Sequence, residues 1–289
     1  MIKASQKFPY PLHTFYHEGK AWEYIATGTG KTFVILPGGG ESAESTFRLV
    51  KKLEHTYRVV VPTIYNVDTI CEFNAVLNAI LDKEKASTII LYGLSLGGLL
   101  AQVYARDHKK RVETLIISHA CTPRSKTYQR KNLLPLRVLQ SVLLVIPTWL
   151  LKFSARLAGV VQGGNSKISN AYPVNLSVKD TEYYNVIMDD YYRRFFDKRL
   201  LQTWIRLHQE FSKQELLPEN YSYLKHNVLI LRTDNDPLMQ DEGDFQRLYP
   251  TANVHTFKDT GHLTFYYQLE SMVEVIKQFL QKNRYYAHR

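Results

Sequence analysis

The sequence has few cysteines. Only Cys71 and Cys121 occur among its 289 residues, so a secreted fold built on several disulfides is excluded. The segment from Met1 to Phe15 also lacks an apolar stretch of the kind found in secretory signals. Both absences favour a reducing compartment, and we predict a cytoplasmic location. The sequence leaves open whether the two cysteines pair.

Metal and nucleotide motifs are absent as well. No group of His, Cys, Asp or Glu has the spacing of a metal site. The glycine-rich stretch Pro37–Gly40 is not followed by the Gly-Lys-Ser/Thr sequence of a phosphate-binding P-loop. We therefore predict that the protein uses no metal and no cofactor.

The chain has an excess of positive charge but no nucleic-acid-binding motif. Its formal net charge is +10, and its isoelectric point is near 9.4. The basic residues are scattered, with small clusters only at Lys109–Arg111 and Arg124–Lys131. This distribution is typical of a solvated basic surface, so no nucleic-acid partner is predicted.

Long uncharged apolar runs are also missing. The segment from Leu133 to Val161 is very apolar, but Pro147 interrupts it. Arg137, Lys152 and Arg156 leave too short an uncharged stretch to span a bilayer. We favour a lid that buries its apolar face over a pocket, with contact at a membrane surface as the less favoured alternative.

Short apolar segments alternate with amphipathic ones along the rest of the chain. This alternation predicts an α/β protein with a mostly parallel sheet covered by helices on both faces, and an antiparallel pair at one edge. The predicted strands are Thr14–Glu18, Trp22–Ile25, Thr32–Leu36, Tyr57–Val61, Thr88–Tyr92, Val112–Ser118, His226–Arg232 and Val254–Phe257. The predicted helices are Ser45–Glu54, Asp68–Asp82, Gly98–Ala105, Asp241–Tyr249 and Leu269–Asn283.

The alternation breaks in the middle of the chain, which is mostly helical in pattern. We predict a core formed by residues 1–121 and 225–289, with residues 122–224 inserted as a helical cap. Within the cap, Tyr183–Phe211 is rich in aromatic and arginine residues at helical spacing. Such a stripe is consistent with packing or with a surface that faces a ligand, and the sequence does not choose between them.

The stretch Gly93-Leu94-Ser95-Leu96-Gly97 carries the strongest functional signal. This G-x-S-x-G sequence stands between an apolar strand and a helix, which is the context of a nucleophile elbow. A side chain at either glycine is expected to collide with the neighbouring strand or helix. Ser95 is therefore the predicted nucleophile, placed at a helix N-terminus where N–H groups stabilise negative charge.

A candidate acid and a candidate general base follow Ser95 in the sequence. His262 stands after the last predicted strand, and Gly261 allows a tight turn there. Asp236 follows the preceding strand and is the preferred acid, with Asp234 as the alternative that could instead cap the loop. The order Ser95, Asp236, His262 is that of α/β-hydrolases.

An oxyanion hole needs two N–H donors. Leu96, which follows the nucleophile, is predicted to supply one. The glycine-rich loop after the Thr32–Leu36 strand is predicted to supply the other through Gly39, with Gly40 in reserve and Gly38 beside it in the pocket. His119 follows the Val112–Ser118 strand and either lines the pocket or has a structural role.

Taken together, these motifs resemble those of the α/β-hydrolase superfamily over nearly the whole chain. The resemblance rests on Leu36–Gly40, Gly93–Gly98, Asp234–Pro237 and Gly261-His262. It implies an eight-stranded, mostly parallel sheet and a serine hydrolase that cleaves an ester or related acyl substrate, with an apolar acyl group favoured by the apolar lid. The loop from Thr63 to Asp68 is more similar to the maspardin-like branch, which implies a non-catalytic binding or scaffold protein as the alternative.

Overall fold

A computed structural model describes most of the predicted core. It covers residues 10–39, 41–65, 67–123, 146–150, 194, 196–236 and 243–287. Gly40, residues 237–242 and most of the predicted cap lie outside the described residues. The division into core and cap at residues 122 and 224 therefore stays a prediction.

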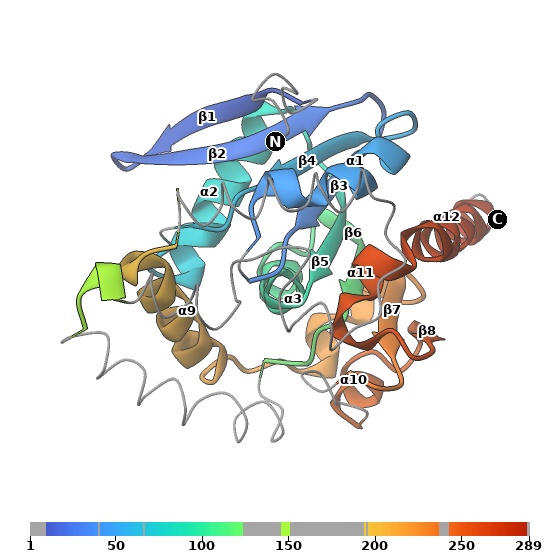
Figure 1. The fold of residues 1–289 in the computed structure, drawn as a ribbon. Helices are drawn as coiled ribbons and strands as arrows, with labels where there is room; N and C mark the ends of the chain where they lie inside the picture. The colour runs from blue at the N-terminus through green and yellow to red at the C-terminus, as the bar shows by residue number, and fades with distance from the viewer. Residues whose placement is uncertain are drawn as a thin grey trace.

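The core is an eight-stranded sheet with the order β1-β2-β4-β3-β5-β6-β7-β8 (Figure 1). The first two strands pair antiparallel, β2 pairs antiparallel with β4, and all the later pairs are parallel. This confirms the predicted mostly parallel sheet with an antiparallel edge. The strands are β1 (Leu12–His17), β2 (Lys20–Thr27), β3 (Thr32–Leu36), β4 (Arg58–Pro62), β5 (Ile89–Leu94), β6 (Val112–Ser118), β7 (Val228–Thr233) and β8 (Asn253–Phe257).

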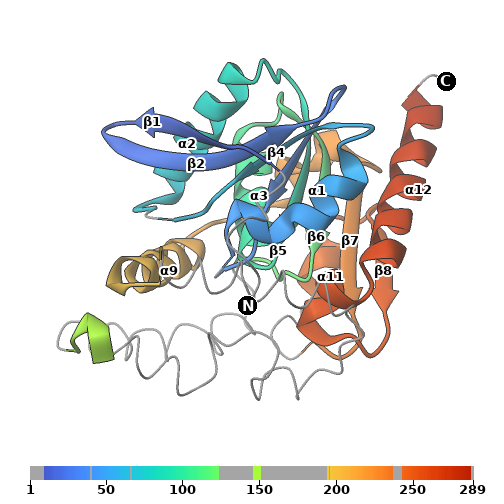
Figure 2. The same ribbon diagram turned by 45° about the horizontal axis from the view of Figure 1, so that its top comes forward.

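Helices cover both faces of the sheet (Figures 1 and 2). One apolar layer joins the sheet to α2, α3 and α10, and the other joins it to α1, α11 and α12. The described helices are α1 (Phe47–Leu53), α2 (Ile70–Lys83), α3 (Leu96–Asp107), α9 (Lys198–Phe211), α10 (Gly243–Leu248), α11 (Thr264–Tyr267) and α12 (Leu269–Ala287), with 3₁₀ turns η1 (Ala43–Thr46), η3 (Pro218–Asn220), η4 (Ser222–Leu224) and η5 (Gly261–Leu263).

Strands buried on both faces explain why the central segments are apolar throughout. In β3, for example, every residue is buried, with Val34 and Leu36 in one apolar layer and Phe33 and Ile35 in the other. Each successive side chain points to the opposite face. A sheet covered on one side only would instead show polar residues at every second position.

Helix α2 begins two residues later than predicted. The Thr69 side chain accepts a hydrogen bond from the Glu72 N–H at 3.0 Å, so Thr69 is the N-cap and the helix starts at Ile70. Asp68 stays outside the helix, where it contacts Lys20 and Arg206. None of the helices in the described residues is both long and apolar enough to span a membrane.

The predicted insertion leaves the sheet between two neighbouring strands. The chain departs after Ser118 at the end of β6 and returns at Val228 to pair directly with β6. Within this interval α9 lies close to the start of α2 (Figures 1 and 2), where the Glu210 carboxylate accepts a hydrogen bond from the Ile70 N–H at 2.6 Å. The apolar segment 133–161 is described only at residues 146–150.

Candidate active site

Ser95 stands on a strained turn between β5 and α3. Its φ of +51° and ψ of −114° lie outside the regions that non-glycine residues ordinarily adopt. The turn is held by a hydrogen bond from the Ser95 N–H to the Ser118 carbonyl at 2.9 Å. Ser95 is the N-cap of α3, but its side chain makes no capping bond, so the hydroxyl remains available for other partners.

The glycines around Ser95 are required by close backbone contacts. A Cβ at Gly93 would lie 2.3 Å from the Gly97 carbonyl oxygen, and one at Gly97 would lie 2.2 Å from the Leu36 carbonyl oxygen. Both distances are far shorter than any real Cβ contact. The predicted collisions with the helix and the neighbouring strand are thus present at these two positions.

His262 brings Ser95 and Asp236 into one hydrogen-bonded chain. Its Nε2 lies 2.9 Å from Ser95 Oγ, and its Nδ1 lies 2.8 Å from Asp236 Oδ2. Asp236 is only 3% exposed, so its charge is shielded from water. Gly261 precedes the histidine with φ +58°, a conformation that favours glycine. Residues from three separate loops therefore meet at the carboxyl edge of the sheet.

The alternative acid, Asp234, holds the loop and does not contact the histidine ring. It is exposed, and its Oδ1 accepts a hydrogen bond from the Asp259 N–H at 3.0 Å. Between the two aspartates, Asn235 accepts a hydrogen bond from the Gly261 N–H at 2.8 Å. Asn235 was not among the predicted site residues, although its position between the two candidate acids was a usable signal.

The glycine-rich loop after β3 has one occupied N–H group and one N–H group without an acceptor among the described residues. The Gly38 N–H is already occupied, because it donates to the Glu41 carboxylate at 2.8 Å. No acceptor for the Gly39 N–H is found in the described part of the chain. A Cβ at Gly39 would lie 3.6 Å from the Leu96 side chain, so the two predicted oxyanion residues are neighbours. Gly40, the reserve donor, is outside the described residues.

The Leu96 N–H is a natural second donor. Leu96 is the first residue of α3, and the first N–H groups of a helix have no carbonyl partner within the helix. They also carry the positive end of the helix dipole, which favours an anion.

Glu41, which accepts the Gly38 N–H, was not anticipated from the sequence, although it directly follows the glycine run.

His119 is buried beside His262 and does not line an open pocket. It is 1% exposed, with its ring centre 6.4 Å from that of His262 and nearly perpendicular to it. Its Nδ1 lies 2.9 Å from Ser118 Oγ, while its Nε2 has no partner among the described residues. Burial, reinforced by His262 and opposed by Asp236, lowers the pKa of His119 from 6.5 to about 4.

This buried imidazole makes the stability of the fold depend on pH. Because the folded pKa of His119 lies below the unfolded value, the unfolded chain takes up the proton first as pH falls. The stability is therefore complete above pH 6.5 and declines toward pH 4. The free energy of unfolding of the wild type should fall between pH 7 and pH 5. In His119→Gln we expect this decrease to be smaller by about 2 kcal/mol, as measured by urea unfolding at the two pH values.

The control for this measurement is His226→Gln. His226 is exposed and lines the hollow near the amino ends of β7 and β8, away from His262 and Asp236. Its pH dependence should therefore match that of the wild type. If His119→Gln keeps the wild-type pH dependence as well, His119 is not the source of the acid sensitivity.

Trp204 of α9 adds an aromatic ring to the loop side of the site. Its Cε2 atom is 3.9 Å from the position that a Gly39 Cβ would occupy. The ring also packs partly against the apolar layer that contains Leu96. Trp204 belongs to the predicted aromatic stripe, for which both packing and ligand contact stayed open, because a local pattern does not show what a helix faces.

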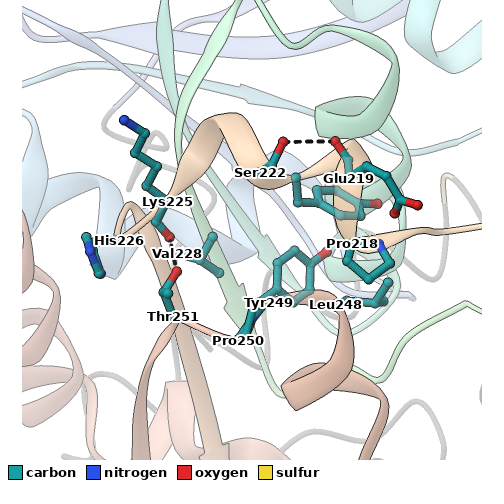
Figure 3. A pocket seen from close by; sticks show the side chains of 11 residues that line it. Pro218, Glu219, Ser222, Lys225, His226, Val228, Leu248, Tyr249, Pro250 and Thr251 are labelled. Carbon is teal, nitrogen blue, oxygen red and sulfur yellow. Dashed lines mark hydrogen bonds between the residues drawn. The ribbon is translucent and has the colours of Figure 1, made fainter.

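A separate hollow lies at the opposite edge of the sheet (Figure 3). It has a volume of about 600 Å³, and it contains none of the predicted site residues. Its wall is formed near the amino ends of β7 and β8, chiefly by Tyr221, Lys225, His226, Tyr249, Pro250 and Thr251. The hydrogen bond from Thr251 Oγ1 to the Lys225 carbonyl at 2.7 Å ties the two loops of this wall together.

The side chains that could bind a metal ion do not cluster in the described part of the chain. Among the described residues, no three His, Cys, Asp or Glu side chains lie close enough to hold a metal ion. Cys71 is exposed and Cys121 is buried, and the two do not form a disulfide, which answers the question that the sequence left open.

Comparison with known proteins places this geometry in a family. A family model described as alpha/beta hydrolase fold matches residues 31–269. Among solved structures, a hydrolase from Pseudomonas aeruginosa is 13% identical over 93% of this chain and 98% of its own, with a TM-score of 0.70. An epoxide hydrolase from Bacillus megaterium is also 13% identical, over 93% and 100%, with a TM-score of 0.67.

A meta-cleavage product hydrolase from Pseudomonas fluorescens is 16% identical over 94% of this chain and 98% of its own, with a TM-score of 0.65. No curated protein sequence matches the chain. At these identities the similarity to solved structures shows the fold alone. The family model, however, spans most of the sequence and includes the positions of Ser95, Asp236 and His262. The chain therefore belongs to the alpha/beta hydrolase family, as the resemblance of its motifs implied.

Proposed function

We propose that the protein is a serine hydrolase that cleaves a carboxylic ester or a related acyl compound. The observation that carries the proposal is the unbroken hydrogen-bonded chain from Ser95 through His262 to Asp236, at 2.9 and 2.8 Å. A serine becomes a nucleophile when a base takes its proton and an acid orients that base. The strained turn at Ser95 supports the same conclusion, because strain of this kind is found at functional sites.

The reaction follows from the positions of these groups. Ser95 Oγ attacks the substrate carbonyl while its proton passes to Nε2 of His262. The Asp236 carboxylate accepts the Nδ1–H bond and stabilises the imidazolium that results. The N–H groups of Gly39 and Leu96 then bind the oxyanion.

Collapse of that first intermediate expels the alcohol, which takes the proton from His262. Water next attacks the acyl-Ser95 carbonyl and gives its proton to His262. The bond between Ser95 Oγ and the acyl carbon then breaks, the proton on His262 returns to Ser95 Oγ, and the acid is released.

The surroundings support an apolar acyl group as the preferred substrate. Leu96 and Trp204 both approach Gly39, so apolar surface adjoins the predicted oxyanion donor. Residues 122–224 are proposed to cover this surface as a cap, and α9 is the longest helix of this range that is described. Burial of a hydrocarbon chain there would contribute about 0.8 kcal/mol per CH₂ group.

A fluorophosphonate probe tests the proposal directly. Such a probe phosphonylates only an activated serine, and we expect labelling of the wild type at a peptide that contains Ser95. Ser95→Ala should abolish the labelling. Ser222→Ala is the matched control, because Ser222 is an exposed serine that donates only to the Glu219 carbonyl.

Labelling in these variants is read by intact-protein mass spectrometry. A wild-type protein with a normal circular dichroism spectrum and no labelling would overturn the hydrolase proposal. It would favour the alternative of a maspardin-like binding or scaffold protein.

A further inference from the structure

Helix α9 is fixed to the core at both of its ends. At its start, Asp197 caps the helix by accepting the Leu200 N–H at 3.0 Å and also accepts the Tyr65 hydroxyl at 3.2 Å. Near its end, Glu210 accepts the Ile70 N–H at 2.6 Å. The position of a side chain in the middle of α9 is therefore set by hydrogen bonds to elements of the core.

Trp204 lies between these two attachments and faces the glycine-rich loop. Of its atoms, Cε2 comes nearest to the space beside Gly39, at 3.9 Å from the position of a Cβ. The indole Nε1 is bonded directly to Cε2, so the N–H group lies one bond away from the atom that approaches the loop. Leu96 borders the same space at 3.6 Å.

The Nε1–H group of Trp204 is buried without an acceptor among the described residues. An indole N–H only donates hydrogen bonds, and a buried donor is nearly always paired. An unpaired donor in a site is a group for which a bound molecule can supply the acceptor. The Gly39 N–H has no acceptor in the described residues either, so two residues in contact range each carry a donor without an acceptor.

We propose that Trp204 Nε1–H donates to an oxygen atom in the acyl chain of the substrate, close to the reacting carbonyl. The site then prefers acyl groups that carry an ether, hydroxyl or keto oxygen near the carbonyl over plain hydrocarbon chains. A site built to pair a substrate oxygen discriminates against the analogue that lacks it, because the buried donor is left unpaired. This inference rests on the proposed hydrolase function.

The test compares two acyl groups of equal length. p-Nitrophenyl methoxyacetate and p-nitrophenyl butanoate differ by one oxygen in place of one CH₂ group. We expect Trp204→Phe, which keeps an aromatic ring but removes the N–H, to lower the ratio of kcat/KM for methoxyacetate over butanoate about tenfold. Differences in intrinsic reactivity cancel, because both enzymes are compared on the same two esters.

Trp22→Phe is the matched control. The Trp22 N–H is also buried without an acceptor among the described residues, but Trp22 belongs to β2 and packs in the apolar layer beside α2. Its removal should leave the ratio unchanged. An unchanged ratio in Trp204→Phe would overturn the proposal. This includes an equal loss on both esters, which is the result expected if Trp204 donates to the carbonyl oxygen that all esters share.

A binding experiment separates this inference from the proposed function. In Ser95→Ala labelled with ¹⁵N-tryptophan, the indole N–H signal of Trp204 is identified by its absence after Trp204→Phe. Methoxyacetate anion should shift this signal and butanoate anion should not, whether or not the protein is a hydrolase. Equal shifts, or no shift with either anion up to saturating concentration, would contradict the role of Trp204.

Discussion

Replacing Asp236 with asparagine is expected to slow ester hydrolysis about 10⁴-fold. The Asp236 carboxylate accepts the Nδ1–H bond of His262 at 2.8 Å and is almost fully buried. An asparagine side chain fits the same space, but its NH₂ group can donate toward Nδ1. The ring would then hold its proton on Nε2, the atom that must accept the proton of Ser95. The measurement is kcat for p-nitrophenyl butanoate at pH 7.

Asp234→Asn is the control for this change. Asp234 is exposed and accepts the Asp259 N–H through Oδ1, a bond that the asparagine carbonyl can also accept. Its kcat should remain within a factor of about three of the wild-type value, as expected for a surface position. If Asp234→Asn lost activity and Asp236→Asn kept it, the acid would be Asp234 and the proposed arrangement would be wrong.

The largest expected effect on stability comes from Gly97→Ala. The added methyl group would lie 2.2 Å from the Leu36 carbonyl oxygen and 2.5 Å from that of Pro37. Both obstacles are backbone atoms at the end of β3, which cannot rotate out of the way as a side chain can. We expect the free energy of unfolding to fall by about 3 kcal/mol or more, measured by urea denaturation.

Gly39→Ala is the matched substitution for this experiment. A methyl group at Gly39 meets nothing closer than 3.6 Å, which is an ordinary contact with Leu96. Its unfolding free energy should remain within about 1 kcal/mol of the wild-type value. A Gly97→Ala protein as stable as Gly39→Ala would show that the turn around Ser95 relaxes more easily than its backbone contacts indicate.

The strands were predictable because strands buried on both faces are short apolar segments that can be recognised locally in the sequence. Thr32–Leu36 and Val112–Ser118 were placed at the residues that the structure shows for β3 and β6. Short elements were not predictable in this way. Helix α11, Thr264–Tyr267, has four residues and therefore completes about one turn, too few for an apolar periodicity to appear.

The same distinction applies to the candidate site. Ser95, Asp236 and His262 stand beside glycines or at strand ends, and these local signals made them candidates, which the structure joins by hydrogen bonds. Trp204 had no such signal, because its importance arises from contact with Gly39, which is remote in sequence. The contact of Glu41 with Gly38 depends on how the loop turns, which composition alone does not specify.

Residues 119–227 connect two neighbouring strands of the sheet, β6 and β7. Leu115 pairs with Val228 and Ser118 with Leu231, so one ladder of hydrogen bonds fixes both ends of this connection. The entropic cost of closing a flexible connection grows only with the logarithm of its length. Lengthening, shortening or exchanging it therefore leaves the alignment of the strands that carry Ser95 and Asp236 almost untouched. Under the proposed function, changes in this segment would alter substrate preference while Ser95, His262 and Asp236 keep their positions.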